Sequence, residues 1–301
     1  MPIDSITTII PNYNGINLIS KYLYKVPGKI IIVDDGSTDN SVEFIKDNFP
    51  KVKLISLNKN FGFSKAANIG INAADTEFVV LLNNDVEVSS EYLLPLIPMF
   101  NDNKVFSVSP KIILPTKNNL DEGCKTGFWH HGLFYCDQRQ NVSEVTPILY
   151  TTGCAAIYRK SMLDELGGFD TAYSPFYWED ADLGYRAWQR GWKSYYNPEI
   201  SVIHQHASTI SNFNKKYTDR VKFRNSLFFV WRNVEDQNIL VAHKKLLFMV
   251  VFKKIITGDL AGFYGWMDAY KRRKEALNQR ELIVKKRVLS DKQIFEQTGI
   301  K

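Results

Sequence analysis

The stretch Thr76-Glu77-Phe78-Val79-Val80-Leu81-Leu82-Asn83-Asn84-Asp85 decides the fold. Its centre, Phe78 to Leu82, is an unbroken apolar run, a pattern typical of a strand buried on both faces of a parallel sheet covered by helices. Ligands of such sheets bind in the crevice at the carboxyl ends of the strands, so Asn83, Asn84 and Asp85 stand where a ligand is expected. A carboxylate there can hold a divalent cation that bridges substrate phosphates. Taken alone, the same triplet also fits a polar turn that closes a strand.

Strands and helices alternate on the N-terminal side of this stretch. Short apolar runs predict strands at Ile6–Ile10, Lys29–Val33 and Val52–Leu57. Helices are expected between them, at about 17–24 and up to about 48, and another around 68–72. This order favours parallel βαβ units with right-handed crossovers.

The bulk composition is that of a soluble globular protein. The chain has 301 residues, a net charge of +6 and a pI near 9.0. Mild basicity suits anionic substrates, anionic lipid or nucleic acid and does not choose among them. The three cysteines, Cys124, Cys136 and Cys154, form no CxxC pair, which favours a reducing compartment. Neither a signal-peptide pattern nor an apolar run of about 18 residues occurs, so we expect a cytoplasmic protein without a spanning helix.

Four motifs follow four of these strands in order. They are Pro11–Gly15, Val33–Asp39, Asn60–Phe63 with Asn68 and Gly70, and Leu82–Asp85. Each motif is modest alone, but the set in this order is similar to the nucleotide-sugar-binding half of a family-two glycosyltransferase. The likeness covers about the first 210 residues.

The resemblance implies an α/β fold of the GT-A (Rossmann-like) type, with a mainly parallel sheet covered by helices. Residues 1–210 would form the catalytic domain, with 1–100 as the nucleotide-sugar-binding half and 101–210 as the acceptor half. Residues 211–301 would form a helical, basic C-terminal extension.

The resemblance also implies which residues meet the donor, a UDP- or dTDP-sugar. Asp35 would accept a hydrogen bond from the uracil or thymine N3–H, and the Pro11–Asn14 loop would cover the base and the ribose. The full set of expected nucleotide-sugar contacts is Pro11, Tyr13, Asn14, Asp34, Asp35, Asn60, Gly62, Phe63, Asn68, Asn83 and Asn84.

A divalent metal, Mn²⁺ or Mg²⁺, is implied in the same way. Asp85 corresponds to the last acid of the family's Asp-X-Asp signature, whereas Asn83 replaces its first acid, so one carboxylate is missing. A histidine at a strand end is often structural. In the family, a histidine at this position completes the metal site, which makes His204 the candidate and His206 the second choice. An imidazole ligand favours manganese over calcium.

Three acids stand within four residues beside aromatic side chains. Glu179, Asp180 and Asp182 would raise one another's pKa if partly buried, which poises a general base near neutral pH. Alternatively, Glu179 and Asp180 only complement the dipole of a helix over 181–189. The resemblance aligns Asp180 with the base that deprotonates the acceptor. Glu179 is the alternative base if the alignment is shifted by one residue. Asp182 would orient the loop or the acceptor, with Arg186 pairing to these acids.

The other acceptor-side segments carry weaker signals. A helix is expected at 91–100, strands at 105–110 and 150–159, an edge strand at 193–196 and a strand at 201–206. The polar stretch 114–145 predicts a loop or hairpin that walls the site. Trp129 and His131 in it, together with Trp178, are candidates for sugar contact, and a loop without a direct role fits equally well.

The tail is basic and helical in pattern. A helix is expected at 217–231, and another from Tyr270 to Arg287. Between them, a seven-residue apolar core lies between the pairs Lys244-Lys245 and Lys253-Lys254, too short to cross a bilayer. Such a segment fits an interfacial helix on an anionic membrane. A helix packed on the catalytic domain with solvated lysines fits equally well.

Together with the residue patterns, the resemblance implies an inverting glycosyltransferase of cell-surface polysaccharide synthesis, acting on a glycan or lipid-linked acceptor. It would work in the cytoplasm, with peripheral contact to the inner face of the cell membrane. Two rivals remain. A nucleotidyltransferase should have a basic Gly-rich loop where Pro11–Gly15 has none. A non-catalytic module that binds carbohydrate, nucleotide or nucleic acid would explain the aromatic residues and the positive charge, but the acids at 179–182 oppose binding of phosphate backbones.

Overall fold

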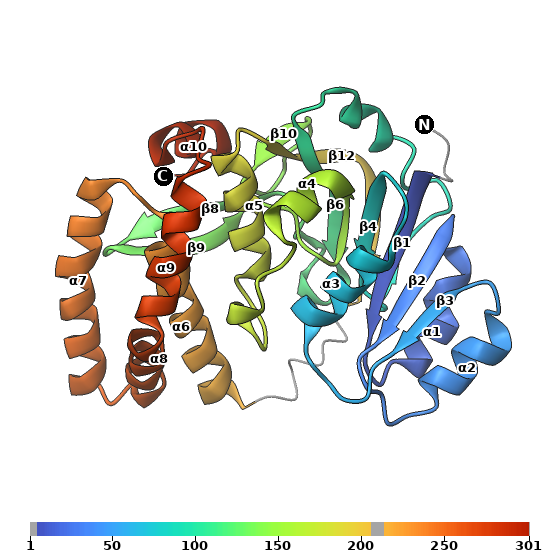
Figure 1. Ribbon diagram of the computed structural model, residues 1–301, viewed down its shortest axis with the longest axis horizontal. Coiled ribbons are helices and arrows are strands. Elements are labelled where there is room, and N and C mark those ends of the chain that lie inside the picture. Colours follow the sequence, from blue (N-terminus) through green and yellow to red (C-terminus); the bar gives the residue numbers. More distant parts are fainter. Residues whose placement is uncertain (1–4, 206–213, 301) are drawn as a thin grey trace.

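The computed structural model describes residues 5–205 and 214–300 (Figure 1). The strands are β1 (Ile6–Asn12), β2 (Lys29–Asp34), β3 (Lys53–Ser56), β4 (Phe78–Leu82), β5 (Val86–Glu87), β6 (Val105–Leu114), β7 (Leu120–Asp121), β8 (Lys125–His130), β9 (Leu133–Gln138), β10 (Thr146–Ile148), β11 (Ala155–Arg159) and β12 (Lys193–His204). The α-helices are α1 (Ile16–Tyr22), α2 (Ser41–Asn48), α3 (Phe63–Ala73), α4 (Lys160–Leu166), α5 (Glu179–Gln189), α6 (Lys215–Asn233), α7 (Gln237–Ile256), α8 (Leu260–Lys271), α9 (Arg273–Val284) and α10 (Asp291–Thr298).

One large mixed sheet carries the site. Its order is β10-β12-β6-β11-β4-β1-β2-β3. Strands β4, β1, β2 and β3 are parallel, as the βαβ pattern predicts, while β11 runs antiparallel between β4 and β6. Parallel strands end at the same edge, so the motifs after β1, β2 and β4 lie side by side. The predicted α/β class is therefore confirmed, with a mixed second half in the sheet.

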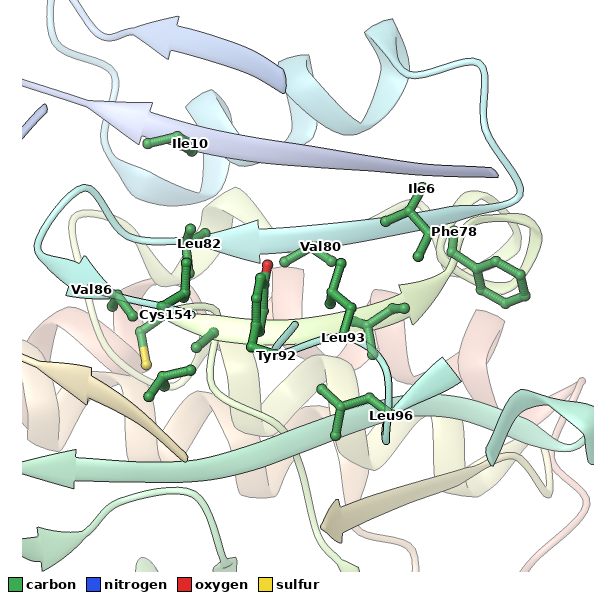
Figure 2. Close-up of a cluster of buried hydrophobic side chains, with 14 of the residues drawn as sticks. Ile6, Ile10, Phe78, Val80, Leu82, Val86, Tyr92, Leu93, Leu96 and Cys154 are labelled. Atoms are coloured by element: carbon green, nitrogen blue, oxygen red, sulfur yellow. The ribbon is translucent and has the colours of Figure 1, made fainter. Parts of the chain in front are cut away.

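Strand β4 is buried on both faces, as its apolar run predicts. Successive side chains of a strand point to opposite faces. Phe78, Val80 and Leu82 pack on one face together with Tyr92, Leu93 and Leu96 (Figure 2). Val79 and Leu81 pack on the other face against α3, α4 and α5. Burial of each such side chain stabilises the fold by about 1.5–3 kcal/mol. Strand β4 is therefore held firmly in the sheet, and its end sets the position of Asn83–Asp85.

The prediction of a helix at 91–100 is wrong, because no α-helix forms there. The chain there makes turns and a 3-10 helix, Ile97–Asn101. Pro95 and Pro98 explain the difference, because proline lacks the N–H that an α-helix needs and its ring clashes with the preceding turn.

The expected edge strand at 193–196 and the strand at 201–206 are one long strand, β12. Its register shifts between Asn197 and Ser201, around Pro198. It is not at an edge, since β10 pairs with Ser194–Tyr196 on one side and β6 on the other. The strand expected at 150–159 is limited to β11, and the hairpin alternative for 114–145 is confirmed as β8–β9.

The C-terminal helices share a core with the acceptor half. Phe229 of α6 stacks on Phe134 of β9 with ring centroids 5.1 Å apart, and its ring edge meets Tyr185 of α5. The helix expected at 217–231 is confirmed as α6, whereas the one expected at 270–287 is broken at Arg272 into α8 and α9. Among the described residues, no helix is long and apolar enough to span a membrane.

Helix α7 stands at the margin of the molecule, at the end opposite β1–β3 (Figure 1). It buries only His243 and Val251. His243 ties it to its neighbours, because Trp231 Nε1 donates to His243 Nε2 at 3.0 Å and His243 Nδ1 lies 2.6 Å from the Gly132 carbonyl. The outward face of α7 is therefore apolar and exposed, unlike that of a helix packed into the core.

Candidate active site

A cavity of about 1470 Å³ lies at the carboxyl ends of β1, β2 and β4 and extends to α6 and α7. Most of the sequence-predicted site residues line it, namely Pro11, Tyr13, Asn14, Asp35, Asn60, Gly62, Phe63, Asn83, Asn84, Asp85, His131, Trp178, Glu179, Asp180 and His204. Four others, Asp34, Asn68, Trp129 and Asp182, do not line it. His206 lies outside the described residues.

The ends of β1 and β4 are joined by two asparagines. Asn84 Nδ2 donates to Asn12 Oδ1 at 2.7 Å. Gly15 sits against this pair, and a Cβ there would come within 2.3 Å of both side chains. The close approach requires glycine and holds the Pro11–Asn14 loop at the cavity.

Asp34 supports this loop from below. Its carboxylate accepts hydrogen bonds from Asn12 Nδ2 at 2.8 Å and from the Ser37 N–H at 2.9 Å. Asn14, with φ at +50°, accepts from the Thr38 N–H at 2.7 Å. Asp34 is thus buried beneath the cavity wall, so the structure offers it no direct nucleotide contact.

Asp35 faces the cavity. Its two carboxylate oxygens accept hydrogen bonds from the N–H groups of Phe61 and Gly62, at 2.9 and 2.8 Å. Burial raises the pKa of Asp35, and these two backbone hydrogen bonds partly oppose the rise. Gly62 has φ at +87°, a conformation that favours glycine. The end of β2 is thereby tied to the loop that precedes α3.

Asn68 holds two segments together away from the cavity. Its side chain donates to the Phe169 carbonyl at 2.8 Å and accepts from the Phe169 N–H at 2.9 Å. This pair connects α3 with the turn that follows α4. Phe63, by contrast, lies at the cavity and meets Phe169 edge to face.

Asp85 and His204 meet from β4 and β12. Asp85 Oδ1 lies 3.3 Å from His204 Nε2, and Glu122 Oε2 lies 3.2 Å from His204 Nδ1. Cys154 belongs to the same cluster, because ligand atoms of Glu122, Cys154 and His204 all lie within 4.8 Å of one another. Burial lowers the pKa of His204, but hydrogen bonds with Asp85, Cys154 and Glu122 outweigh it and raise that pKa to about 12.

This cluster fits a divalent metal. Carboxylate oxygen and imidazole nitrogen together suit Mn²⁺, and the charges of buried Asp85 and partly buried Glu122 would balance its charge. A metal must displace the proton on the ligating nitrogen, so its binding would release a proton from His204. Asn83 lines the cavity beside Asp85 but offers only a neutral amide oxygen.

Glu179 and Asp180 open helix α5 at the cavity. The helix begins after Trp178, which has φ at +81°, and no side chain caps it. The Gly153 N–H donates to Asp180 Oδ1 at 3.1 Å. Burial and the neighbouring charge of Glu179 raise the pKa of Asp180 well above its usual range, and burial raises the pKa of Glu179 to about 7. This pair can accept a proton near neutral pH.

Asp182 lies inside the protein. It accepts hydrogen bonds from Tyr173 Oη at 2.9 Å, Arg186 Nε at 2.7 Å and Asn233 Nδ2 at 2.8 Å. The predicted pairing of Arg186 with the acids is confirmed, and Arg186 also donates to the carbonyls of Leu166 and Gly168. Asp182 therefore fixes the orientation of α5 through contacts on the buried side of the helix.

Trp129 and His131, the two candidates for sugar contact on the β8–β9 hairpin, lie in different surroundings. Trp129 packs on Phe134 and Phe295, with ring centroids 5.2 and 6.2 Å away. His131, at the turn with φ at +48°, lines the cavity. Sequence reasoning did not find Glu122, Lys125 or Lys222, which also line it, because no local pattern marks them.

Asn225 of α6 holds the loop that carries Trp178. Its Nδ2 donates to the carbonyls of Tyr173, Phe176 and Tyr177 at 2.7, 3.1 and 2.9 Å. Tyr177, like Trp178, has a positive φ, +68°. Such backbone persists only when its surroundings hold it. The sequence gives no signal for this role, since an asparagine inside a helical pattern looks neutral.

We expect Asn225→Leu to destabilise the fold by about 1–3 kcal/mol, because it leaves buried carbonyls without a donor. Transfer activity should fall further than donor binding, since the loop carries the acids and not the nucleotide contacts. Thermal unfolding and UDP titration measure the two effects. Asn48→Leu is the control, because the Asn48 amide bonds one exposed carbonyl on α2. Equal stability of the two variants would contradict the proposed clamp.

The chain is similar in sequence to known glycosyltransferases. Residues 7–167 match the family model "Glycosyl transferase family 2". The N-acetylglucosaminyl-diphospho-decaprenol L-rhamnosyltransferase of Mycobacterium tuberculosis is 26% identical over 208 residues, which cover 60% of this chain and 67% of that protein. The O-antigen chain rhamnosyltransferase RfbN of Salmonella typhimurium is 23% identical over 224 residues, covering 71% and 70%.

Solved structures share the fold. GalNAc-T7 with UDP, GalNAc and Mn²⁺ superposes with a TM-score of 0.64 at 19% identity, covering 98% of this chain and 56% of that one. The S. aureus TarS 1–349 complex with UDP-GlcNAc has a TM-score of 0.59 at 16% identity, covering 93% and 90%. Given the family match over more than half of its length, the chain belongs to glycosyl transferase family 2 and is a glycosyltransferase with the GT-A fold.

Proposed function

We propose that this glycosyltransferase transfers a sugar, with inversion, from a UDP- or dTDP-sugar to a hydroxyl of a glycan or lipid-linked acceptor. The observation that carries the proposal is that one cavity holds Asp35, the Asp85–His204 pair and Asp180. We place the reaction in cell-surface polysaccharide synthesis, in the cytoplasm at the inner face of the cell membrane. Relatives whose names contain a diphospho-decaprenol and an O-antigen chain support the assignment to polysaccharide synthesis.

The donor base would lie under the Pro11–Asn14 loop. Although both oxygens of Asp35 already accept backbone hydrogen bonds, a carboxylate oxygen has a second lone pair. Asp35 would use it to accept the N3–H of uracil or thymine. Cytosine has no N3–H, so the same contact would select UDP or dTDP over CDP.

Asp85 and His204 would hold Mn²⁺ or Mg²⁺ on the donor diphosphate. When bound, the metal supplies Lewis-acid stabilisation of the leaving diphosphate. Asn83, which replaces an acid, would contribute a neutral oxygen at most, so the diphosphate itself completes the charge balance.

Asp180 would act as the general base. It takes the proton of the acceptor hydroxyl while that oxygen attacks the anomeric carbon from the face opposite the diphosphate. The new glycosidic C–O bond forms as the bond from the anomeric carbon to the diphosphate oxygen breaks, and the nucleoside diphosphate leaves. One displacement inverts the anomeric centre, and no sugar becomes attached to the protein.

The pH profile tests the pairing of the two acids. Below the pKa of Asp180 the base is protonated, so kcat/KM should rise with pH through an acidic limb. Because the charge of Glu179 raises the pKa of Asp180, Glu179→Gln should move that limb to lower pH, by about one pH unit. A limb that stays in place or moves to higher pH would contradict the coupling.

A donor screen by nucleotide release tests the proposal as a whole. Purified protein with Mn²⁺ is offered UDP-, dTDP-, GDP- and CDP-sugars, with water and a panel of glycans as acceptors. We expect release from UDP- or dTDP-sugars alone. Nucleotide binding without release for every donor would favour a non-catalytic binding module. Release of a sugar 1-phosphate in place of a nucleoside diphosphate would favour a nucleotidyltransferase.

A further inference from the structure

The outward face of α7 is apolar and uncovered. Phe248, Phe252 and Ile255 recur at i, i+4 and i+7 on one side of the helix and are 75%, 56% and 53% exposed. Ile256, 69% exposed, extends this face toward Leu260 at the start of α8. We call these five side chains the α7 face. Contiguous exposed apolar surface of this kind marks an interaction site.

The charges around the α7 face are positive. Lys244 and Lys245 are exposed in the first half of α7, and Lys253 is exposed near its end. Helix α7 contains no Asp or Glu. The nearest acid at its end, Asp259, is engaged by Lys254 at 2.7 Å. An apolar helical face flanked by lysines matches the interface of an anionic lipid bilayer.

The opposite side of α7 forms a wall of the active-site cavity. Leu246 and Val250, about 160° around the helix from Phe248, line the cavity that also holds Asp180. Met249 lines it from the border between the two sides and is 64% exposed. The α7 face and the acceptor end of the cavity are thus two sides of one helix. A molecule anchored in a bilayer beneath the α7 face would lie next to a helix that lines the cavity holding Asp180.

Cationic side chains gather at this end of the cavity. Lys222, Lys253 and Lys254 line it, together with the acids Asp219 and Asp259. Lys222 Nζ lies 4.5 Å from the ring centroid of Tyr177, next to the loop that carries the catalytic acids. Because Lys254 is paired with Asp259, Lys222 and Lys253 are the side chains best placed to meet an anionic group.

We propose that the α7 face lies on an anionic membrane and that the acceptor is a lipid-linked phosphate or diphosphate, entering along α7. Lys222 and Lys253 would hold its phosphate while its sugar hydroxyl reaches Asp180. The proposal rests on the proposed function, since it takes Asp180 as the base. A second copy of this chain fits the α7 face less well, because a twofold contact would bring equivalent lysines of two α7 helices together.

Vesicle flotation tests the membrane contact. The protein should bind phosphatidylcholine vesicles that contain about 30% phosphatidylglycerol, and salt should weaken the binding. The double change Phe248→Gln and Phe252→Gln should reduce the bound fraction about tenfold. Leu94→Gln with Leu282→Gln is the matched control, because both leucines are 60% exposed elsewhere. Equal binding of both double variants, or no binding of the wild type, would overturn the proposal.

Farnesyl diphosphate tests the phosphate contact on protein loaded with UDP and Mn²⁺. Lys222→Ala with Lys253→Ala should weaken its binding about tenfold, while UDP affinity stays unchanged. Undiminished binding would overturn the lysine assignment. Normal UDP binding and donor turnover without vesicle binding would overturn this inference and leave the proposed function standing. A stable dimer by light scattering that fails to bind vesicles would assign the α7 face to a second copy instead.

Discussion

Asp180→Asn is expected to lower kcat about 10³-fold while the Kd for UDP stays within about twofold. The amide keeps the shape of the side chain and can still accept the Gly153 N–H, but it cannot take a proton from the acceptor. Nucleotide release under saturating donor measures kcat, and titration with UDP and Mn²⁺ measures Kd. Asp137→Asn, at an exposed acid of β9, is the control and should change neither value.

The stability of the Asp180→Asn variant shows whether Asp180 has a catalytic or a structural role. An acid whose pKa is raised by folding binds its proton more tightly in the folded state, so its contribution falls as pH rises above the unfolded pKa. The Asn variant should therefore be at least as stable as the wild type at pH 8 and comparable to it at pH 5. A loss of activity and UDP binding together, with a lower Tm at pH 8, would make Asp180 structural.

The second large effect is expected at the metal site. Asp85→Asn should remove most of the gain in UDP affinity that Mn²⁺ provides, a loss of about 10- to 100-fold. The amide removes the charge that pairs with the ion but keeps the volume at the end of β4. UDP titrations with Mn²⁺ and with chelator, on both proteins, give the difference directly.

Glu87→Gln is the control for this change. Glu87 lies two residues further along and pairs with Lys25 at 2.6 Å, outside the cavity lining. Its replacement should leave the Mn²⁺ dependence intact. If Asp85→Asn retains the same dependence as the wild type, the ion is held by the diphosphate or by other residues, and the assignment of Asp85 and His204 is wrong.

Local patterns explain why much of the donor half was predictable. The short apolar run Phe78–Leu82, which ends abruptly in polar residues, has the length and pattern of a buried strand. Parallel strands then bring their polar ends together. Position along a strand is harder to read. Asp34 and Asp35 are neighbours that point to opposite sides, so one supports the loop and the other faces the cavity. The sequence motif contains both acids and does not show which one supports the loop and which one faces the cavity.

The acceptor half depends on contacts between distant residues, which no local pattern records. Asp180 and Asp182 are two positions apart on α5, about 200° around the helix, so one faces the cavity and the other the interior. Asn225 acts on carbonyls about 50 residues earlier in the chain. The α7 face shows the same limit, since an apolar run between lysines fits burial and exposure equally until its neighbours are placed.

Anomalous diffraction from crystals soaked with Mn²⁺ and UDP tests the central claim, that Asp35, Asp85 and His204 serve one donor site beside Asp180. We expect one manganese peak in coordination contact with Asp85, His204 and the diphosphate, with the uracil N3–H directed at Asp35. Manganese bound away from Asp85 and His204, or uracil bound away from Asp35, would contradict the account.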